Sequence, residues 1–374
     1  MKIGIVTFWG VPNYGAMLQA YALWHYLEAR GHSVEFIDYD FCRSILPSFG
    51  RCFLTRHISA IRNRLKMYFS RQMLDFVRTF PRTRRFSSYN QLIMDCPRYD
   101  YLIVGSDQMW NPMWLTGDRL RFVMLDFVDN LCHKLACSVS FGTDCWPEHQ
   151  DAVLAGELMR RFLAISVREE SGVNLVRRLS GREDSICLID PTMLYGADFY
   201  YKLFIDTNNA HDDSYVFEYF IENSAEDLQT QDVIKAIMSE MQINKLKNDQ
   251  VPVKGVLSIL YQKIKIRSKL KVENWLSCLS NASFVCTNSF HGTVFSLLFH
   301  RPFITILRQG ELTGMNERII SLLEKVGLSD RAVFSNEIQG VRNKIKKIID
   351  WEVVDQRLLD ERSEYLRFMQ LAGL

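Results

Sequence analysis

No hydrophobic run in the 374-residue sequence approaches the roughly 20 apolar residues that a membrane-spanning helix needs. The opening MKIGIVTFWG is interrupted too early for a signal peptide, and no small-residue cleavage site follows it. The sequence also lacks a CxxC pair, and its nine cysteines are an odd number in mostly apolar surroundings. Scattered thiols of this kind are typical of a reducing compartment. We therefore expect a soluble, cytoplasmic protein.

Several common signatures of catalysis are absent as well. The sequence has no Walker lysine, no GxGxxG loop, no GxSxG nucleophile elbow and no cysteine in a nucleophile motif. Its histidines do not cluster with cysteines or carboxylates at the spacing of metal ligands, so we expect no metal site. The net charge of +2 gives no reason to expect nucleic acid as a partner.

Positive charge is nevertheless concentrated in two tracts. Residues 51–85 contain ten Lys or Arg against one acidic residue, and residues 245–271 contain eight against one. Such tracts suggest local anionic partners, either a ligand or a lipid surface. In residues 51–86 apolar side chains lie among the arginines, so this segment is either a solvated helix or a helix on an anionic membrane surface.

The apolar pattern predicts an α/β fold. With 48% hydrophobic residues the chain has ample material for a large core, and its length fits two domains. A β-branched run at 2–9, helical spacing at 15–31 and another strand-like run at 32–39 form a strand–helix–strand unit, which is typical of a parallel sheet. A second series begins at 214–221, after an Asn- and Asp-rich linker.

We therefore predict two Rossmann-like lobes with a cleft between them. The N-terminal α/β lobe would span residues 1–195, with a basic helical insertion at about 51–90. The C-terminal α/β lobe would span 205–345, and a final helix 350–374. In open parallel sheets ligands bind beyond the carboxyl ends of the strands, so the residues that follow the strands are the candidate site.

Polar residues follow two strands of the first half. After the first strand, Gly15 allows a close backbone approach to a ligand at a helix N-terminus, where free N–H groups favour anions. The alternative is an ordinary glycine-containing turn capped by Asn13. After YLIV, Asp107 can orient a hydroxyl or act as a base, whereas the alternative is that Ser106 or Asp107 merely caps the next segment.

Three arginines are candidates for binding an anion. Arg168 ends the hydrophobic run FLAISV, and its guanidinium can hold a carboxylate or phosphate through two parallel hydrogen bonds. The alternative is an ion pair with Glu169 or Glu170. Further along, Arg308 ends another apolar run and Arg318 falls in a helix, where the alternative for Arg318 is a solvated surface charge.

One histidine stands at a strand-to-helix seam. In CTNSFHGTVFS, His291 follows the apolar run ASFVC, beside Ser289 and Thr287, and precedes Gly292 and a helix. An imidazole there can bind phosphate, or titrate near neutrality and move a proton. The alternative is a structural histidine with its hydrogen bonds satisfied.

Four segments together resemble the polysaccharide pyruvyl transferase family of bacteria. They are IGIVTFWGVPNYGAMLQAYAL, YDYLIVGSDQMWNP, AISVREESG and NASFVCTNSFHGTVFSLLFHRPFITI, in the family's order between residue 3 and about residue 331. The resemblance implies a fold like that of GT-B glycosyltransferases. It also implies transfer of an enolpyruvyl unit from phosphoenolpyruvate to two hydroxyls of a sugar, which forms a pyruvate ketal. No redox step occurs in that reaction, so no cofactor is expected.

The resemblance assigns roles to individual residues. His291 matches the histidine at the donor phosphate, Arg168 an arginine that holds the donor, Asp107 an acidic residue at the cleft, and Gly15 the N-terminal glycine turn. We expect His291 and Asp107 to supply the acid and the base. The other expected substrate-binding residues are Asn13, Ser106, Gln108, Asn288, Ser289, Gly292, Arg308 and Arg318.

This sequence departs from the family pattern at two positions. Some members have Arg where Ser289 stands, and others have Asp where Asn288 stands; Arg308 or Arg318 could complete the donor site instead. The expected acceptor is a sugar of a surface polysaccharide or its lipid-linked precursor, reached by peripheral contact with the inner membrane face. The competing interpretations are a GT-B glycosyltransferase that uses a nucleotide sugar, and a non-catalytic member that only binds sugar.

Overall fold

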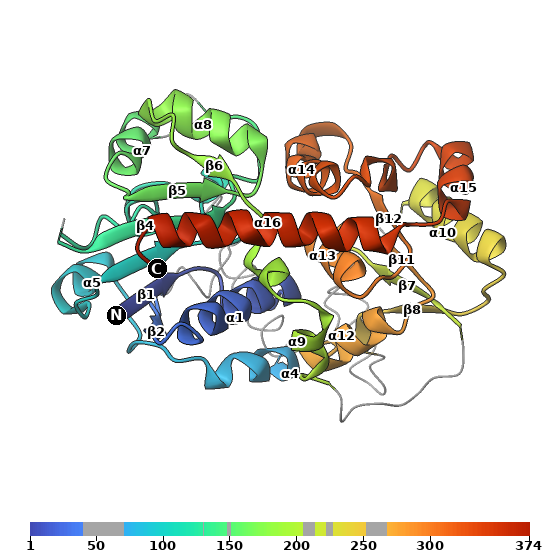
Figure 1. The fold of residues 1–374 in the computed structure, drawn as a ribbon, viewed down its shortest axis with the longest axis horizontal. Helices are drawn as coiled ribbons and strands as arrows, with labels where there is room; N and C mark the ends of the chain where they lie inside the picture. Colours follow the sequence, from blue (N-terminus) through green and yellow to red (C-terminus); the bar gives the residue numbers. More distant parts are fainter. Residues whose placement is uncertain (40–70, 130, 148–150, 205–213, 222–226, 252–267) are drawn as a thin grey trace, which may run out of the picture.

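Parallel β-strands in both halves of the chain determine the architecture (Figure 1). The computed structural model describes residues 1–39, 71–129, 131–147, 151–204, 214–221, 227–251 and 268–374. Within these ranges the strands form one parallel sheet in each half of the chain, and a short antiparallel pair, β9 (Gln250–Val251) and β10 (Ser268–Lys269).

The N-terminal lobe is built on a six-stranded parallel sheet in the order β2-β1-β3-β4-β5-β6. Its strands are β1 (Lys2–Val6), β2 (Ser33–Phe36), β3 (Tyr101–Val104), β4 (His133–Val139), β5 (Ala164–Val167) and β6 (Ile186–Cys187). All four residues of β3 are buried, which explains why YLIV is continuously apolar: helices cover both faces of the sheet.

Helices and 3-10 turns connect the strands of this lobe. They are α1 (Tyr14–Glu28), α4 (Arg71–Leu74), η1 (Asp75–Thr79), α5 (Tyr89–Asp95), η2 (Pro112–Trp114), α6 (Asp118–Val123), α7 (Ala152–Met159) and α8 (Glu170–Ser180). Of the basic helical insertion predicted at about 51–90, residues 51–70 lie outside the described part of the chain.

The C-terminal lobe has a five-stranded parallel sheet in the order β13-β12-β11-β7-β8. Its strands are β7 (Val216–Tyr219), β8 (Leu246–Asn248), β11 (Phe284–Thr287), β12 (Phe303–Ile306) and β13 (Ala332–Val333). Its helices and turns are α10 (Leu228–Met241), α12 (Val272–Ser280), α13 (Phe290–Leu298), η6 (Gly310–Asn316), α14 (Glu317–Lys325), η7 (Ser329–Arg331) and α15 (Ile338–Lys346). Together the two parallel sheets confirm the predicted α/β fold of two Rossmann-like lobes.

One hydrophobic cluster crosses from the N-terminal lobe into the C-terminal lobe, and a second, smaller cluster lies within the C-terminal lobe. A continuous cluster of buried residues extends from the first sheet to Trp275 and Phe295 of the second lobe. Tyr14, at the start of α1, stacks on Trp275 with ring centroids 4.8 Å apart, and its hydroxyl donates to the carbonyl of Leu270 at 3.0 Å. The first turn of α1 is therefore anchored in the opposite lobe.

The last helix, α16 (Trp351–Leu371), spans both lobes (Figure 1). At its start Trp351 stacks on His300 of the C-terminal lobe, with ring centroids 4.9 Å apart. After its end the carbonyl of Ala372 accepts a hydrogen bond from the hydroxyl of Tyr101 in β3, at 3.0 Å. The helix thus fastens the C-terminal lobe to the first sheet. Between the lobes, η3 (Pro191–Leu194) and α9 (Ala197–Tyr201) form the connection.

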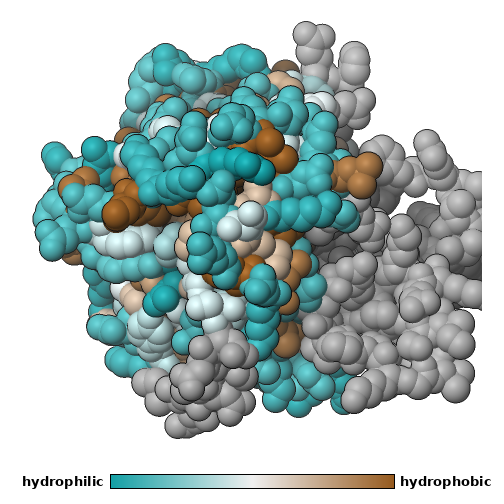
Figure 2. Space-filling view, turned by 90° about the vertical axis from the view of Figure 1, so that its right-hand side faces the viewer, coloured by the Kyte–Doolittle hydropathy of each residue, from teal (hydrophilic) through white to brown (hydrophobic). Residues whose placement is uncertain are grey.

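Helix length and surface hydropathy can be compared with what a membrane-spanning protein needs. None of the helices in the described ranges is both long and apolar enough to cross a bilayer. The end of the C-terminal lobe that faces the viewer in Figure 2 is mainly hydrophilic, and its hydrophobic residues form separate patches.

Candidate functional site

The carboxyl ends of both sheets meet at the junction between the lobes. The segments after β3 and β5 carry Ser106, Asp107 and Arg168, and the segment after β11 carries His291. All strands within each sheet are parallel, so their carboxyl ends share one edge. The predicted residues from separate strands are brought together here.

A buried carboxylate, that of Asp190, lies at the centre of this cluster. Its Oδ2 lies 2.6 Å from Nη1 of Arg168, 2.8 Å from the hydroxyl of Ser106 and 3.6 Å from Nε2 of His291. Its Oδ1 accepts hydrogen bonds from the backbone N–H and the hydroxyl of Thr192, at 2.9 and 2.6 Å. The side chain is completely buried.

The charges around Asp190 determine its protonation state. Burial alone would raise the pKa of Asp190, because a carboxylate loses hydration. The neighbouring His291 and Arg168 and the hydrogen bond from Thr192 more than offset this effect, so the pKa of the carboxyl lies well below its usual range. Asp190 is therefore an anion at neutral pH and balances part of the local positive charge.

The sequence had suggested that His291 precedes a helix. In the structure it lies within the first turn of α13. The helix begins at Phe290, and its N-cap Ser289 accepts a hydrogen bond from the backbone N–H of Gly292 at 3.3 Å. The side chain is 9% exposed, and its Nε2 is buried without a hydrogen-bond partner among the described residues, since 3.6 Å to Asp190 is too long for a hydrogen bond. That nitrogen is nevertheless within ion-pair distance of Asp190 when the imidazole is protonated.

Two glycines allow His291 to occupy this position. A Cβ on Gly15 would lie 1.9 Å from Nδ1 of His291, and a Cβ on Gly292 would lie 2.4 Å from the hydroxyl oxygen of Thr287. The sequence predicted that a ligand would approach the backbone at Gly15. In the structure the imidazole of His291 fills that space. Both glycines are needed for close packing between elements.

Arg318 is buried, so the alternative of a solvated surface charge is wrong. It lies in the first turn of α14, and burial, together with the nearby Arg168, lowers the pKa of its guanidinium to about 10. With the Gln108 amide oriented to satisfy its neighbours, its oxygen accepts from Nη1 and Nη2 of Arg318 at 2.9 and 2.7 Å. Gln108 belongs to the opposite lobe, so this contact also joins the lobes.

The two buried guanidinium groups flank one aromatic ring. The guanidinium carbon of Arg168 lies 4.7 Å from the centroid of Phe290, and that of Arg318 lies 5.8 Å from it. The ring gives both cations some stabilisation. The Nε atoms of both arginines are buried and have no hydrogen-bond partner among the described residues. Positive charge with spare hydrogen-bond donors is therefore concentrated at this point.

A second buried carboxylate, that of Glu169, supports the loop after β4. Its Oε1 accepts from the backbone N–H groups of Phe141 and Gly142 at 2.7 and 3.2 Å, and from the hydroxyl of Ser140 at 3.0 Å. Burial raises the pKa of Glu169, and Arg168 and other neighbours only partly oppose this. The sequence had offered Glu169 or Glu170 as the ion-pair partner of Arg168, but the guanidinium pairs with Asp190 and Asp107 instead.

Asp107 is the more accessible of the predicted acid–base pair. Its side chain is 15% exposed, and its Oδ1 lies 3.5 Å from Nη2 of Arg168 and accepts from the backbone N–H of Gln108 at 2.8 Å. Its φ of 67° places it in the left-handed region, which turns the chain sharply after β3. The carboxylate thus lies beside the cationic cluster while keeping contact with solvent.

Two predicted substrate-binding residues, Asn13 and Asn288, have evident roles in the fold. Asn13 caps α1 by accepting from the backbone N–H of Ala16 at 3.2 Å, which was the alternative for this residue. Asn288 bridges to the backbone of Ile221 with both its amide oxygen and its nitrogen, at 2.8 and 3.3 Å. Arg308 follows β12 as expected and is half-buried, with its backbone N–H bonded to Asn316.

Sequence reasoning missed Asp190, although a signal was present. The residue stands in CLIDPTML, shortly after β6 and before a proline, and the same strand-end rule selected Asp107 and Arg168. Nothing in the pattern alone distinguished it from an ordinary turn residue. In the part of the chain that the structure covers, no group of three or more His, Cys, Asp or Glu side chains has the arrangement of a metal site.

Comparison with known proteins places the chain in a family. The model of the polysaccharide pyruvyl transferase family matches residues 13–310. The chain belongs to the polysaccharide pyruvyl transferase family. This confirms the resemblance drawn from the four sequence segments. No curated relative matches the sequence at a significant level.

Solved structures share the fold of this pyruvyl transferase family member at low sequence identity. A putative UDP-N-acetylglucosamine 2-epimerase from Listeria monocytogenes has a TM-score of 0.50 and 9% identity, covering 96% of this chain and 90% of its own. The UDP-GlcNAc 2-epimerase from Methanocaldococcus jannaschii has a TM-score of 0.49 and 11% identity, and the match covers 94% of this chain and 93% of that protein. The Staphylococcus aureus MnaA–UDP structure has a TM-score of 0.48 and 13% identity, and the match covers 97% of this chain and 90% of that protein. The likeness to the Listeria monocytogenes protein agrees with the fold of two Rossmann-like lobes that the two parallel sheets show.

Proposed function

We propose that this protein transfers an enolpyruvyl unit from phosphoenolpyruvate to a saccharide and forms a pyruvate ketal. One observation carries the proposal: Arg168, Arg318 and His291 converge at the lobe junction with buried, unpartnered nitrogen atoms. Phosphoenolpyruvate carries a carboxylate and a phosphate, and such a ligand needs several fixed cations. Membership of the pyruvyl transferase family supports the same donor.

The reaction balances without an external co-reactant. The methylene carbon of the donor gains a proton and becomes a methyl group, the first sugar hydroxyl bonds to the adjacent carbon, and phosphate leaves with its bonding electron pair. The second hydroxyl then bonds to the same carbon and closes the ketal. Of the two hydroxyl protons, one ends on the methyl group and one on phosphate, so the products are the ketal and hydrogen phosphate.

Each proposed residue has a separate task. Arg168 and Arg318 hold the donor's negative charges, and the N–H groups in the first turn of α13 add to the positive potential there. His291 delivers a proton to the donor as phosphate leaves, and Asp107 accepts the proton of the attacking hydroxyl. The partial exposure of Asp107 allows a saccharide hydroxyl to reach it. The acceptor is a sugar of a surface polysaccharide or its lipid-linked precursor.

The decisive experiment follows the carbon atoms of the donor. Purified protein is incubated with phosphoenolpyruvate labelled in the carboxyl carbon, with saccharide acceptors, and phosphate release is measured alongside label transfer. Equal appearance of phosphate and acid-labile label on the saccharide supports the proposal. A parallel reaction with labelled UDP-sugars tests the glycosyltransferase alternative. Sugar transfer without pyruvyl transfer would overturn the proposal, and binding of saccharide without either reaction would indicate a non-catalytic member.

A further inference from the structure

We infer that Asp190 is a positioning residue that holds Arg168 and His291 in a single geometry. The inference rests on the proposed function, because that function assigns donor binding to Arg168 and proton transfer to His291. It adds a residue outside both sheets, in the connection between the lobes, that acts on the reaction through these two side chains.

Asp190 does not itself meet the substrates. Its side chain has no exposed surface, and both of its oxygen atoms already have partners. Thr192 donates two hydrogen bonds to Oδ1, while Arg168 and Ser106 lie within hydrogen-bonding distance of Oδ2. A carboxylate in this state has no capacity left for a ligand, so its influence must pass through its neighbours.

One oxygen atom of Asp190 faces both cationic side chains. Its Oδ2 lies 2.6 Å from Nη1 of Arg168 and 3.6 Å from Nε2 of His291. The ion pair with Asp190 engages Nη1, and Nη2 lies 3.5 Å from Oδ1 of Asp107, which leaves the Nε of Arg168 without a hydrogen-bond partner among the described residues. A proton on Nε2 of His291 would face the same carboxylate. Asp190 therefore sets the direction of the arginine and the electrostatic environment of the imidazole together.

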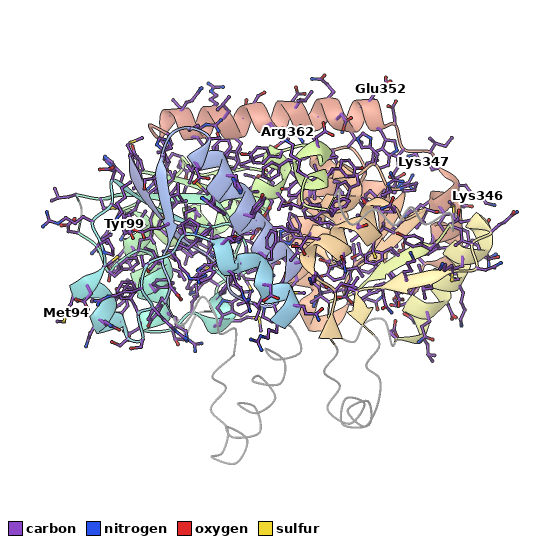
Figure 3. All side chains as sticks on the ribbon, turned by 90° about the horizontal axis from the view of Figure 1, so that it is seen from below. Met94, Tyr99, Lys346, Lys347, Glu352 and Arg362 are labelled. Carbon is purple, nitrogen blue, oxygen red and sulfur yellow. The ribbon has the colours of Figure 1, made fainter. Side chains whose placement is uncertain are left out.

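The position of Asp190 is fixed by the backbone around it. Asp190 is the N-cap of η3, whose first residue is Pro191, and the proline ring limits the freedom of the turn. Arg362 of α16, labelled in Figure 3, donates from Nε and Nη2 to the carbonyls of Met193 and Tyr195, at 2.6 and 3.1 Å. The helix that joins the lobes thus holds the turn that carries the carboxylate.

Double-mutant cycles on turnover and on donor affinity test the inference. Asp190→Asn preserves the shape of the side chain and removes its charge. We expect it to lower the turnover number for phosphate release by about tenfold or more, since residues in direct contact couple strongly. In a His291→Gln background, Asp190→Asn should lower the turnover number by less than about twofold, because the proton transfer that Asp190 supports is already lost. Affinity for phosphoenolpyruvate is measured by calorimetry for Asp190→Asn, for Arg168→Lys and for the double variant. The loss of affinity in the double variant should be smaller than the sum of the two single losses in free energy.

Two further variants separate positioning from stability. Asp126→Asn is the matched control, because Asp126 also pairs with two arginines, at 2.5 and 2.6 Å, but its partners Arg121 and Arg161 are not part of the candidate site. It should leave turnover unchanged. If Asp190→Asn does not fold, Thr192→Val removes one hydrogen bond to Oδ1 and keeps the charge. It should lower turnover a few-fold in the natural background and not in the His291→Gln background.

The outcomes distinguish this inference from the proposed function. If the unmodified protein binds phosphoenolpyruvate and the effects are non-additive, the inference stands. Binding with effects that multiply independently in both backgrounds would show that Asp190 only supports the fold, and would overturn the inference while leaving the function intact. Absence of phosphoenolpyruvate binding and of phosphate release in the unmodified protein would overturn the proposed function and, with it, this role of Asp190.

Discussion

Gly15 lies directly against the imidazole of His291, so closely that a Cβ on Gly15 would be 1.9 Å from Nδ1. The two residues come from different lobes, and each is the second residue of its helix, α1 and α13. The first turns of these helices are therefore neighbours, and their free N–H groups add positive potential next to the imidazole. The position of His291 thus depends on how the two lobes are docked.

Replacing Gly15 by alanine should damage catalysis more than stability. The added methyl group must displace the imidazole, and a displacement of about 1 Å can cost about 10²-fold in rate. We expect turnover to fall by that order with a modest change in melting temperature. Gly340→Ala in α15 is the control, because a Cβ there meets no atom within 4 Å. Normal turnover in Gly15→Ala would show that the geometry of His291 is not critical.

His291 itself should serve the chemistry more than the fold. His291→Ala should lower turnover by about 10²–10⁴-fold, which is the usual contribution of a general acid or base, with little change in melting temperature. His291→Gln should be nearly as poor, since an amide forms hydrogen bonds but cannot titrate. Melting curves and phosphate release are measured on both variants. An early-melting alanine variant whose folded fraction turns over normally would instead identify a structural histidine.

Arg318 should report donor binding through thermal stability. Its guanidinium is buried close to Arg168, and an anionic ligand would relieve the repulsion between the two cations. A donor concentration about 100 times the dissociation constant should stabilise the unmodified protein by about 2.7 kcal/mol. We expect Arg318→Met to lose this shift in melting temperature. Arg177→Met should keep it, because Arg177 is a half-exposed residue that pairs with Glu183.

Glu169 should make the protein less stable as the pH rises above the mid-acidic range. Its pKa is raised in the folded state, so between the unfolded and folded values the native state binds more protons than the unfolded state. Its contribution to stability is present below the unfolded pKa of about 4.3 and is lost as the pH rises through the folded value. Glu169→Gln removes this titration.

Melting temperatures across the pH range check the prediction for Glu169. The variant and the unmodified protein should differ least near pH 4, and the difference should grow in favour of glutamine towards neutral pH. Asp190 has the opposite sign, because its folded pKa is lowered: its contribution is present above the unfolded pKa of about 3.9 and is lost as the pH falls. A glutamine variant with the same pH profile as the unmodified protein would contradict the assignment.

The basic segment at residues 51–86 is expected to help the protein reach a lipid-linked acceptor. All its arginines in the described part of the chain are exposed, and two of them pair with acidic residues: Arg78 with Asp75 and Arg84 with Asp95. Flotation with vesicles that contain anionic lipid should show binding that weakens as salt increases, since about 1 kcal/mol is gained per basic residue near such a surface. Arg71→Gln with Arg85→Gln should weaken it, and Lys235→Gln, exposed on α10, should not. Equal binding to neutral vesicles, or none, would refute the idea.

The sequence by itself determined the alternation of strands and helices and the family. Runs such as YLIV and ASFVC could be recognised because strands buried on both faces are mainly apolar along their length. It also determined that Asp107, Arg168 and His291 stand near the ends of strands, because the chain needs polar residues where it leaves the core. These are local properties, and local pattern and propensity specify them.

Only the tertiary structure decided which of these residues act together. Asp190 meets Ser106, Arg168 and His291 across separations of 84, 22 and about 100 positions in the chain, and no periodicity records such contacts. The burial of Arg318 was equally unpredictable, because a helical position is exposed or buried according to the neighbour that covers it. That neighbour is the opposite lobe, and the lobes are placed by the packing of Tyr14 and α16 against elements distant in sequence.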